Sequence, residues 1–182
     1  MIDAAPLFVA AGLATLPALD MCFRPFVEWT QCYCKGAEYL SWAMPGWLFL
    51  PMWIIFYGFA TAAEIIYALI GSSFCCGSPV SGLYASIAAL WFFNILLVIL
   101  WKTLFFKRYM HGRALCIAIV LFLDTLALAI LYGTQMAAMS ILPFIFWIIY
   151  TLWIVYIGVL NITWVANYEP APEGGRKGRY DT

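Results

Sequence analysis

The chain has 182 residues, of which 66% are hydrophobic, 19% aromatic and only 10% charged, whereas about a quarter of the residues are charged in an ordinary soluble domain. A soluble protein of this size could not bury so much apolar surface, because its surface is large relative to its volume. The formal net charge is zero, so no basic field attracts nucleic acid. The composition therefore predicts a polytopic membrane protein rather than a soluble enzyme, a nucleic-acid binder or a disordered chain.

A membrane helix needs about 20 consecutive apolar residues, because a rise of about 1.5 Å per residue must cross about 30 Å of hydrocarbon. Five segments meet this requirement, and their continuous apolar runs do not fit the alternating strands of a membrane barrel. We therefore predict an all-α fold, a bundle of five transmembrane helices within residues 1–168. In chain order the spans are approximately Ala4–Phe23, Trp47–Ile70, Leu83–Phe106, Ala114–Tyr132 and Ile141–Ala166.

The first span lacks the basic start of a signal peptide, so we expect it to stay uncleaved. One long connection, residues 24–46, follows it, and a loop of this length is either a lid or binding element or a plain linker. The last segment, residues 169–182, consists mainly of proline, glycine and charged residues, which predicts a flexible polar tail.

The lysines and arginines predict the orientation, because these residues are enriched in cytoplasmic loops. With five spans, all nine fall on one side of the membrane. They are Arg24, Lys35, Lys102, Lys107, Arg108, Arg113, Arg176, Lys177 and Arg179. We therefore expect an integral, multi-pass protein with a cytosolic C-terminus.

Aromatic residues are abundant, with 9 Trp, 11 Tyr and 14 Phe. Some fit the belts that anchor helix ends at the membrane surface, but others recur within the spans at helical spacing. These stripes are Trp53, Tyr57, Ala60 and Glu64 in the second span, Asn94, Val98, Trp101 and Phe105 in the third, and Trp153, Ile157, Leu160 and Trp164 in the fifth. Such stripes either pack against neighbouring helices or line an aromatic cavity for a flat, apolar ligand.

A run of tryptophans and prolines enters the second span, and it consists of Trp42, Pro45, Trp47, Pro51 and Trp53. This run resembles the hallmark of the translocator protein family (tryptophan-rich sensory proteins, TspO). Further similarities are Trp101 with Leu104, Phe105 and Phe106, Gly112 with Ala114 and Leu115, and the set Tyr150, Trp153, Tyr156, Leu160 and Asn161. The resemblance extends over most of residues 41–167.

The resemblance implies a cavity that opens toward the first loop and holds tetrapyrroles, sterols or synthetic aromatic molecules. The candidate ligand-binding residues are Trp42, Pro45, Trp47, Trp53, Trp101 and Trp153, together with Tyr57, Asn94 and Ile157 from the same stripes. The prolines would stiffen a lid, and the indoles would offer stacking faces and N–H donors. No cofactor is required, and haem or protoporphyrin IX is expected as a ligand.

The resemblance also implies a homodimer surrounded by membrane lipid, and the mitochondrial outer membrane is the usual location of the family in animals. Sterol binding is the least supported property. The tyrosine and the arginine of the family's sterol-associated segment fall on Ile162 and Ala166 here.

Two acids, Glu64 and Asp124, lie well inside spans, where exposure to lipid would cost each about 2.5–3.5 kcal/mol or more. They therefore either line a polar part of the cavity or hydrogen-bond between helices. We expect no metal site, because the Cys32–Cys34 pair with a single distant His111 is not a credible zinc site. No Ser-His-Asp, Cys-His or paired-carboxylate arrangement predicts catalysis.

The favoured hypothesis is a receptor that binds a tetrapyrrole or another flat lipophilic molecule in order to sense, sequester or transfer it. The alternatives are a porphyrin or sterol transporter that uses Glu64 and Asp124, an activity that degrades porphyrin, and a purely structural membrane protein.

Overall fold

The computed structural model describes residues 42–74, 80–107, 110–135 and 140–167. These residues form four long helices, α3 (Gly46–Phe74), α4 (Val80–Lys102), α5 (His111–Gln135) and α6 (Leu142–Asn167), and a short π-helix, η1 (Thr103–Lys107), that continues α4. The predicted first span, residues 4–23, and the predicted tail, residues 169–182, lie outside the described residues.

Each of the four helices is long and apolar enough to cross a membrane. The membrane-crossing stretches are Trp47–Ile70, Ala85–Phe105, His111–Thr134 and Leu142–Ala166. The bounds of these stretches lie within three residues of those of the second to fifth predicted spans. The largest difference is the start of α5 at His111 instead of Ala114, and it arises because the carbonyl oxygen of Met110 already accepts a helical hydrogen bond from the Ala114 N–H at 2.9 Å.

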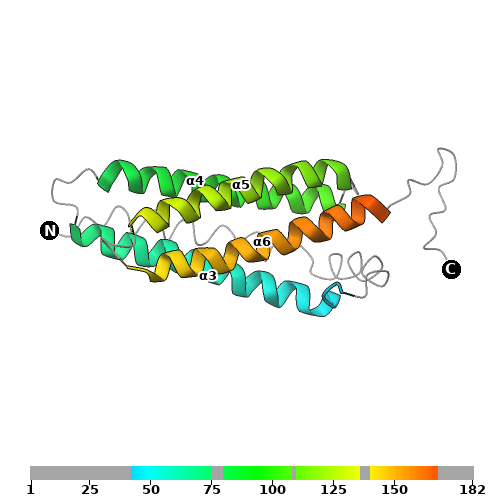
Figure 1. Cartoon of the computed structure of the whole chain (residues 1–182), viewed down its shortest axis with the longest axis horizontal. Helices are drawn as coiled ribbons and strands as arrows, with labels where there is room; N and C mark the ends of the chain where they lie inside the picture. Colours follow the sequence, from blue (N-terminus) through cyan, green and yellow to red (C-terminus); the bar gives the residue numbers. More distant parts are fainter. Residues whose placement is uncertain (1–41, 75–79, 108–109, 136–139, 168–182) are drawn as a thin grey trace.

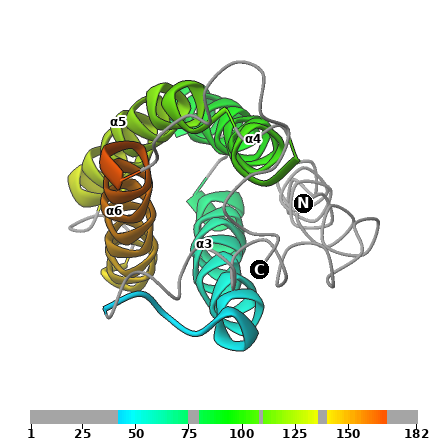
Figure 2. The same cartoon turned by 90° about the vertical axis from the view of Figure 1, so that its right-hand side faces the viewer.

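Successive helices run in opposite directions along the long axis of the bundle (Figure 1). The most extensive contacts join α5 to α6, α6 to α3 and α4 to α5. Viewed along the axis, α4, α5 and α6 form an arc, and α3 lies against its concave side (Figure 2). Side chains from α3, α4 and α6 therefore meet inside this arc.

The predicted aromatic stripes face the interior. Every member of the stripes on α3 and α4 is buried, and on α6 only Trp164 is partly exposed. The opposite faces carry exposed leucine, isoleucine and valine, for example Ile119 and Leu123 of α5 and Leu152 of α6. An apolar outer face around a polar and aromatic interior is the arrangement that a lipid environment requires.

The π-helix η1 was not expected from the sequence, which predicts a regular helix up to Phe106. After η1 ends, the Met110 N–H donates a hydrogen bond to the carbonyl oxygen of Leu104, six residues earlier, at 3.0 Å. The Phe105 ring then stacks on the Trp101 ring, with their centroids 5.1 Å apart. Such single π-turns occur frequently at functional sites.

Candidate ligand-binding site

Three tryptophans from three different helices meet near the end of the bundle at which α3 begins and α4 ends. The Trp53 ring of α3 lies 6.0 Å from the Trp101 ring of α4 and 5.5 Å from the Trp153 ring of α6, centroid to centroid. All three side chains are buried. We refer to Trp53, Trp101 and Trp153 as the indole cluster.

Other aromatic rings extend the indole cluster along α3. Phe56 stacks on Trp153 with a centroid distance of 4.8 Å, and Phe49 contacts the same indole at 5.8 Å. Tyr57, one turn after Trp53, has its ring 5.3 Å from the Trp53 ring. Offset and edge-to-face pairs of this kind are stabilising beyond the area that they bury. The core around the cluster includes Ile157, which is also fully buried.

The segment before α3 covers one side of the cluster through Tyr156. The backbone N–H of Met44 donates a hydrogen bond to the Tyr156 hydroxyl at 3.0 Å, and the Trp42 ring meets the Tyr156 ring edge-on at 6.0 Å. The Tyr156 ring in turn stacks on Trp153 at 5.2 Å. We call residues 42–45 the cap, because they lie over Tyr156, which in turn stacks on the cluster.

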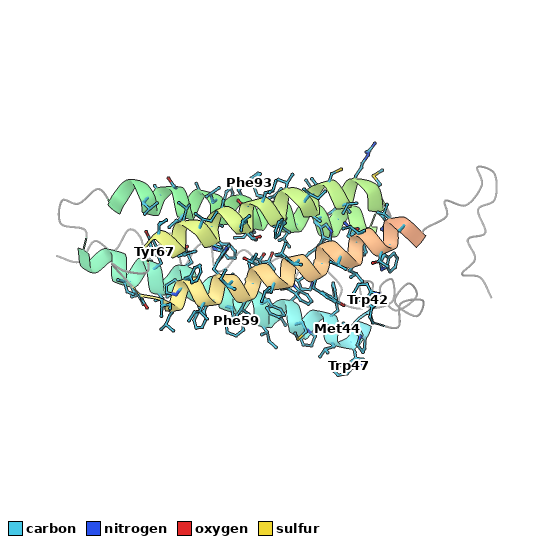
Figure 3. All side chains as sticks on the ribbon, viewed as in Figure 1. Trp42, Met44, Trp47, Phe59, Tyr67 and Phe93 are labelled. Carbon is cyan, nitrogen blue, oxygen red and sulfur yellow. The ribbon has the colours of Figure 1, made fainter. Side chains whose placement is uncertain are left out.

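Not every candidate residue joins the cluster. Trp47 is 69% exposed and points away from the bundle, while Trp42 and Met44 lie beside α6 (Figure 3). Pro45 is also exposed, and its carbonyl oxygen accepts the Leu48 N–H at 2.9 Å where α3 begins. The tryptophan and proline run therefore divides into an inward residue, Trp53, and residues at the periphery.

Indole N–H groups and one ammonium group lie at the cluster. Within the part of the chain that the structure describes, the indole Nε1 atoms of Trp53 and Trp153 are buried and have no hydrogen-bond partner. The ammonium group of Lys102 lies 5.2 Å from the centroid of the Trp53 ring and 5.6 Å from that of Tyr57, which is cation–π geometry. The Lys102 side chain is only 1% exposed.

The sequence prediction missed Lys102 as a site residue, because it counted this lysine only as an orientation signal. A signal was nevertheless present. Lys102 lies inside the predicted span Leu83–Phe106 and directly follows Trp101, and an ionisable residue within a span is a functional candidate by default.

A second polar group lies deeper, where α4, α5 and α6 meet. The Asn94 amide donates to Asp124 Oδ2 at 2.8 Å, and the Tyr150 hydroxyl donates to Asn94 Oδ1, also at 2.8 Å. Tyr57 hydrogen-bonds Tyr150 in addition. Asn94 is therefore connected to the indole cluster indirectly. Hydrogen bonds lead from Asn94 to Tyr150 and on to Tyr57, and the Tyr57 ring packs on the Trp53 ring.

Glu64 lies apart from both groups. Oε2 of Glu64 accepts a hydrogen bond from the Tyr132 hydroxyl at 2.7 Å, which connects α3 to α5. Among the described residues, the second carboxyl oxygens of Glu64 and Asp124 are buried without a hydrogen-bond partner. Each acid thus connects two helices through one oxygen.

The described residues contain no group of three histidine, cysteine or acidic side chains that could hold a metal ion. Cys116 is exposed on α5, and the cysteines of the first loop lie outside the described residues. What the site offers chemically is aromatic stacking faces, N–H donors and one buried ammonium group.

The sequence profile of the TspO/MBR family matches residues 7–166. The chain belongs to the TspO/MBR family. The match covers most of the chain and confirms the resemblance carried by the tryptophan and proline run. No curated protein and no solved structure gives a significant match. This TspO/MBR protein is accordingly an integral membrane protein with aromatic-rich transmembrane helices.

Proposed function

We propose that this TspO/MBR protein is a membrane receptor that binds a flat, lipophilic ligand, a tetrapyrrole such as protoporphyrin IX, at the indole cluster. The observation that carries the proposal is the convergence of Trp53, Trp101 and Trp153 from three helices. The N–H donors of Trp53 and Trp153, which have no hydrogen-bond partner among the described residues, support it, because a flat ligand with acceptor atoms stacks on the rings and satisfies the donors.

The cap is the proposed entrance for the ligand. It contacts Tyr156 through the hydrogen bond from Met44 and the edge of the Trp42 ring, and Ala43 and Met44 also pack against the core. Because the rings of the cluster contact one another, the ligand must separate some of them as it enters. Residues 42–45 lie before the start of α3, so the cap can move without breaking a helix.

The test is a titration of the purified protein with protoporphyrin IX, followed by the absorbance of the porphyrin and by tryptophan fluorescence. Trp53→Ala should weaken binding at least tenfold, whereas Trp47→Ala should leave it unchanged. The two variants remove the same chromophore, but Trp53 is buried in the cluster and Trp47 is 69% exposed outside it. Equal binding by both variants would refute the cluster as the site.

Transport is the second candidate function, and the chain of hydrogen bonds from Tyr57 through Tyr150 to Asn94 and Asp124 favours it. These groups continue from the indole cluster toward the centre of the bundle. A transporter predicts flux of porphyrin into vesicles that depends on Asp124 and Glu64, while a receptor predicts binding without flux. A porphyrin-degrading activity predicts a chemically altered product after incubation.

Four further properties belong to the same proposal. The lysine and arginine distribution supports a cytosolic C-terminus, and family membership supports a homodimer and, in an animal cell, the mitochondrial outer membrane. Cholesterol should bind more weakly than protoporphyrin, because Ile162 and Ala166 offer it no polar contact. Titration with cholesterol in parallel tests this expectation.

A further inference from the structure

Asn161 carries a fully buried amide in the last third of α6. Its side chain is 0% exposed. Among the described residues, neither its Nδ2 nor its Oδ1 atom has a hydrogen-bond partner. Such atoms are rare in native proteins, because a donor or acceptor that leaves water without finding a new partner costs free energy. The packing of the described helices therefore does not account for this amide.

The other buried asparagine of the described helices, Asn94, shows what a structural amide does. Its Nδ2 donates to Asp124 and its Oδ1 accepts from Tyr150, both at 2.8 Å, so that both polar atoms connect helices. Asn161 makes no such hydrogen bond within the part of the chain that the structure describes. A connection between helices thus explains Asn94 but does not explain Asn161.

Asn161 lies on the inward side of α6, beyond the indole cluster. It follows Ile157 by four residues and precedes Trp164 by three, so these side chains lie on one side of the helix. With a rise of about 1.5 Å per residue, Asn161 lies about 12 Å further along α6 than Trp153. One molecule can therefore place a flat ring system among the indoles and a side group at Asn161.

Aromatic rings and a further N–H donor extend to the same region. The Phe105 ring stacks on the Trp101 ring of the indole cluster at 5.1 Å and meets the Trp164 ring at 5.3 Å. The indole Nε1 of Trp164 is buried and has no hydrogen-bond partner among the described residues. The aromatic lining of the proposed site thus continues to the turn of α6 that carries Asn161.

We propose that Asn161 binds a polar side group of the ligand and selects an uncharged group that donates and accepts hydrogen bonds side by side. Carboxamides, lactams and undissociated carboxylic acids have this arrangement. The inference rests on the proposed function and narrows its ligand class. The Asn161 Nδ2 donates to the carbonyl oxygen of such a group, and Oδ1 accepts from its N–H or O–H. An ester has no donor and leaves Oδ1 unpaired.

The test compares two uncharged derivatives of protoporphyrin IX, its diamide and its dimethyl ester. They share one ring system, and only the diamide has N–H donors on its side groups. Each is titrated against the full-length protein in detergent micelles, with porphyrin absorbance as the readout. The wild-type protein should bind the diamide about tenfold more tightly than the ester, the worth of one hydrogen bond. Asn161→Leu should remove this preference by weakening the diamide more than the ester.

The stability of the ligand-free variant is a second readout. Leucine is close to asparagine in size and replaces the unpaired amide by an apolar group, so Asn161→Leu should unfold about 2 °C or more above the wild-type protein. An asparagine that holds helices together would lower the unfolding temperature when it is replaced. Thr163→Val is the matched control, because the Thr163 hydroxyl donates to the carbonyl oxygen of Val159 in the same helix. This variant should keep the preference for the diamide.

Equal binding of diamide and ester by the wild-type protein, or an unchanged preference in Asn161→Leu, would overturn the role of Asn161 while the proposed function stands. A lower unfolding temperature of ligand-free Asn161→Leu would also overturn it, because the amide would then be held by the protein itself. Failure of protoporphyrin IX and both derivatives to bind the wild-type protein would refute the proposed function and this inference with it.

Discussion

Replacing Asn94 by leucine should loosen the contact among α4, α5 and α6. Leucine is close to asparagine in size, so the substitution removes hydrogen bonds without leaving a large cavity. It breaks two interhelical hydrogen bonds of 2.8 Å, one to Asp124 and one from Tyr150. Interhelical hydrogen bonds in membrane proteins contribute about 0.6 kcal/mol on average and up to about 1.7 kcal/mol. The expected loss in the free energy of unfolding is therefore about 1 to 3 kcal/mol.

Tyr150→Phe removes the hydrogen bond to Asn94 and the one with Tyr57, and should cost about 1 to 3 kcal/mol. Because Asn94→Leu already breaks the bond between Tyr150 and Asn94, the double variant should lose less stability than the sum of the two single variants. Unfolding in mixed micelles of a mild detergent and dodecyl sulfate, followed by tryptophan fluorescence, measures the three values as a double-mutant cycle. Thr163→Val is the control, since the Thr163 hydroxyl donates to the carbonyl oxygen of Val159 within the same helix, α6.

Additive effects of Asn94→Leu and Tyr150→Phe would show that the two side chains do not act as one group. A loss below about 0.5 kcal/mol for Asn94→Leu would show that the unfolded chain within the micelle replaces both bonds. Either result would refute the conclusion that Asn94 holds the three helices together.

Three smaller changes test the cap and the packing of the helices. Tyr156→Phe removes the acceptor of the Met44 N–H and should speed both association and dissociation of protoporphyrin IX in stopped-flow measurements; unchanged rates would contradict entry at the cap. Gly158→Ala should stabilise the protein by about 0.4 to 1 kcal/mol, because a Cβ atom there meets nothing within 4 Å. Gly133→Ala should give no such gain, since its Cβ would lie 3.2 Å from Cε2 of Phe144. Thermal unfolding of the two alanine variants side by side checks the difference. Equal gains in stability would argue against close packing at residue 133.

The spans and their inward faces could be predicted from the sequence because both follow from simple periodic rules. A run of about 20 apolar residues marks a span, and a spacing of three or four residues marks a helix face. Trp53, Tyr57 and Glu64 were placed on one stripe by this rule, and all three are buried. Helix spacing also shows why Trp47 differs, since six residues at about 100° per residue turn it about 120° away from Trp53.

The position of the Lys102 side chain could not be predicted in the same way. Hydropathy treats a lysine near the end of a span as a surface residue, and only the packing of Trp53 and Tyr57 from α3 reveals a site for its ammonium group. The π-helix η1 is a similar case. Its wider turn is followed by a hydrogen bond from Met110 back to Leu104, and no pattern in residues 103–107 indicates it.

Asp124 distinguishes the receptor from the transporter, because the receptor uses its carboxyl group as a hydrogen-bond acceptor and the transporter uses its charge or its proton. A receptor needs only the connection to Asn94, and an amide oxygen at residue 124 can accept that hydrogen bond as a carboxylate does. Asp124→Asn should then keep the free energy of unfolding within about 0.5 kcal/mol of the wild-type value and leave protoporphyrin binding unchanged. Asp124→Leu removes the acceptor of the Asn94 hydrogen bond, so its free energy of unfolding should fall by about 1 kcal/mol or more. A transporter needs the charge or the proton of the acid, so flux into vesicles would vanish in Asp124→Asn although folding and binding persist. Measuring stability, binding and flux on the same preparation of this variant therefore separates a structural connection from a transport step.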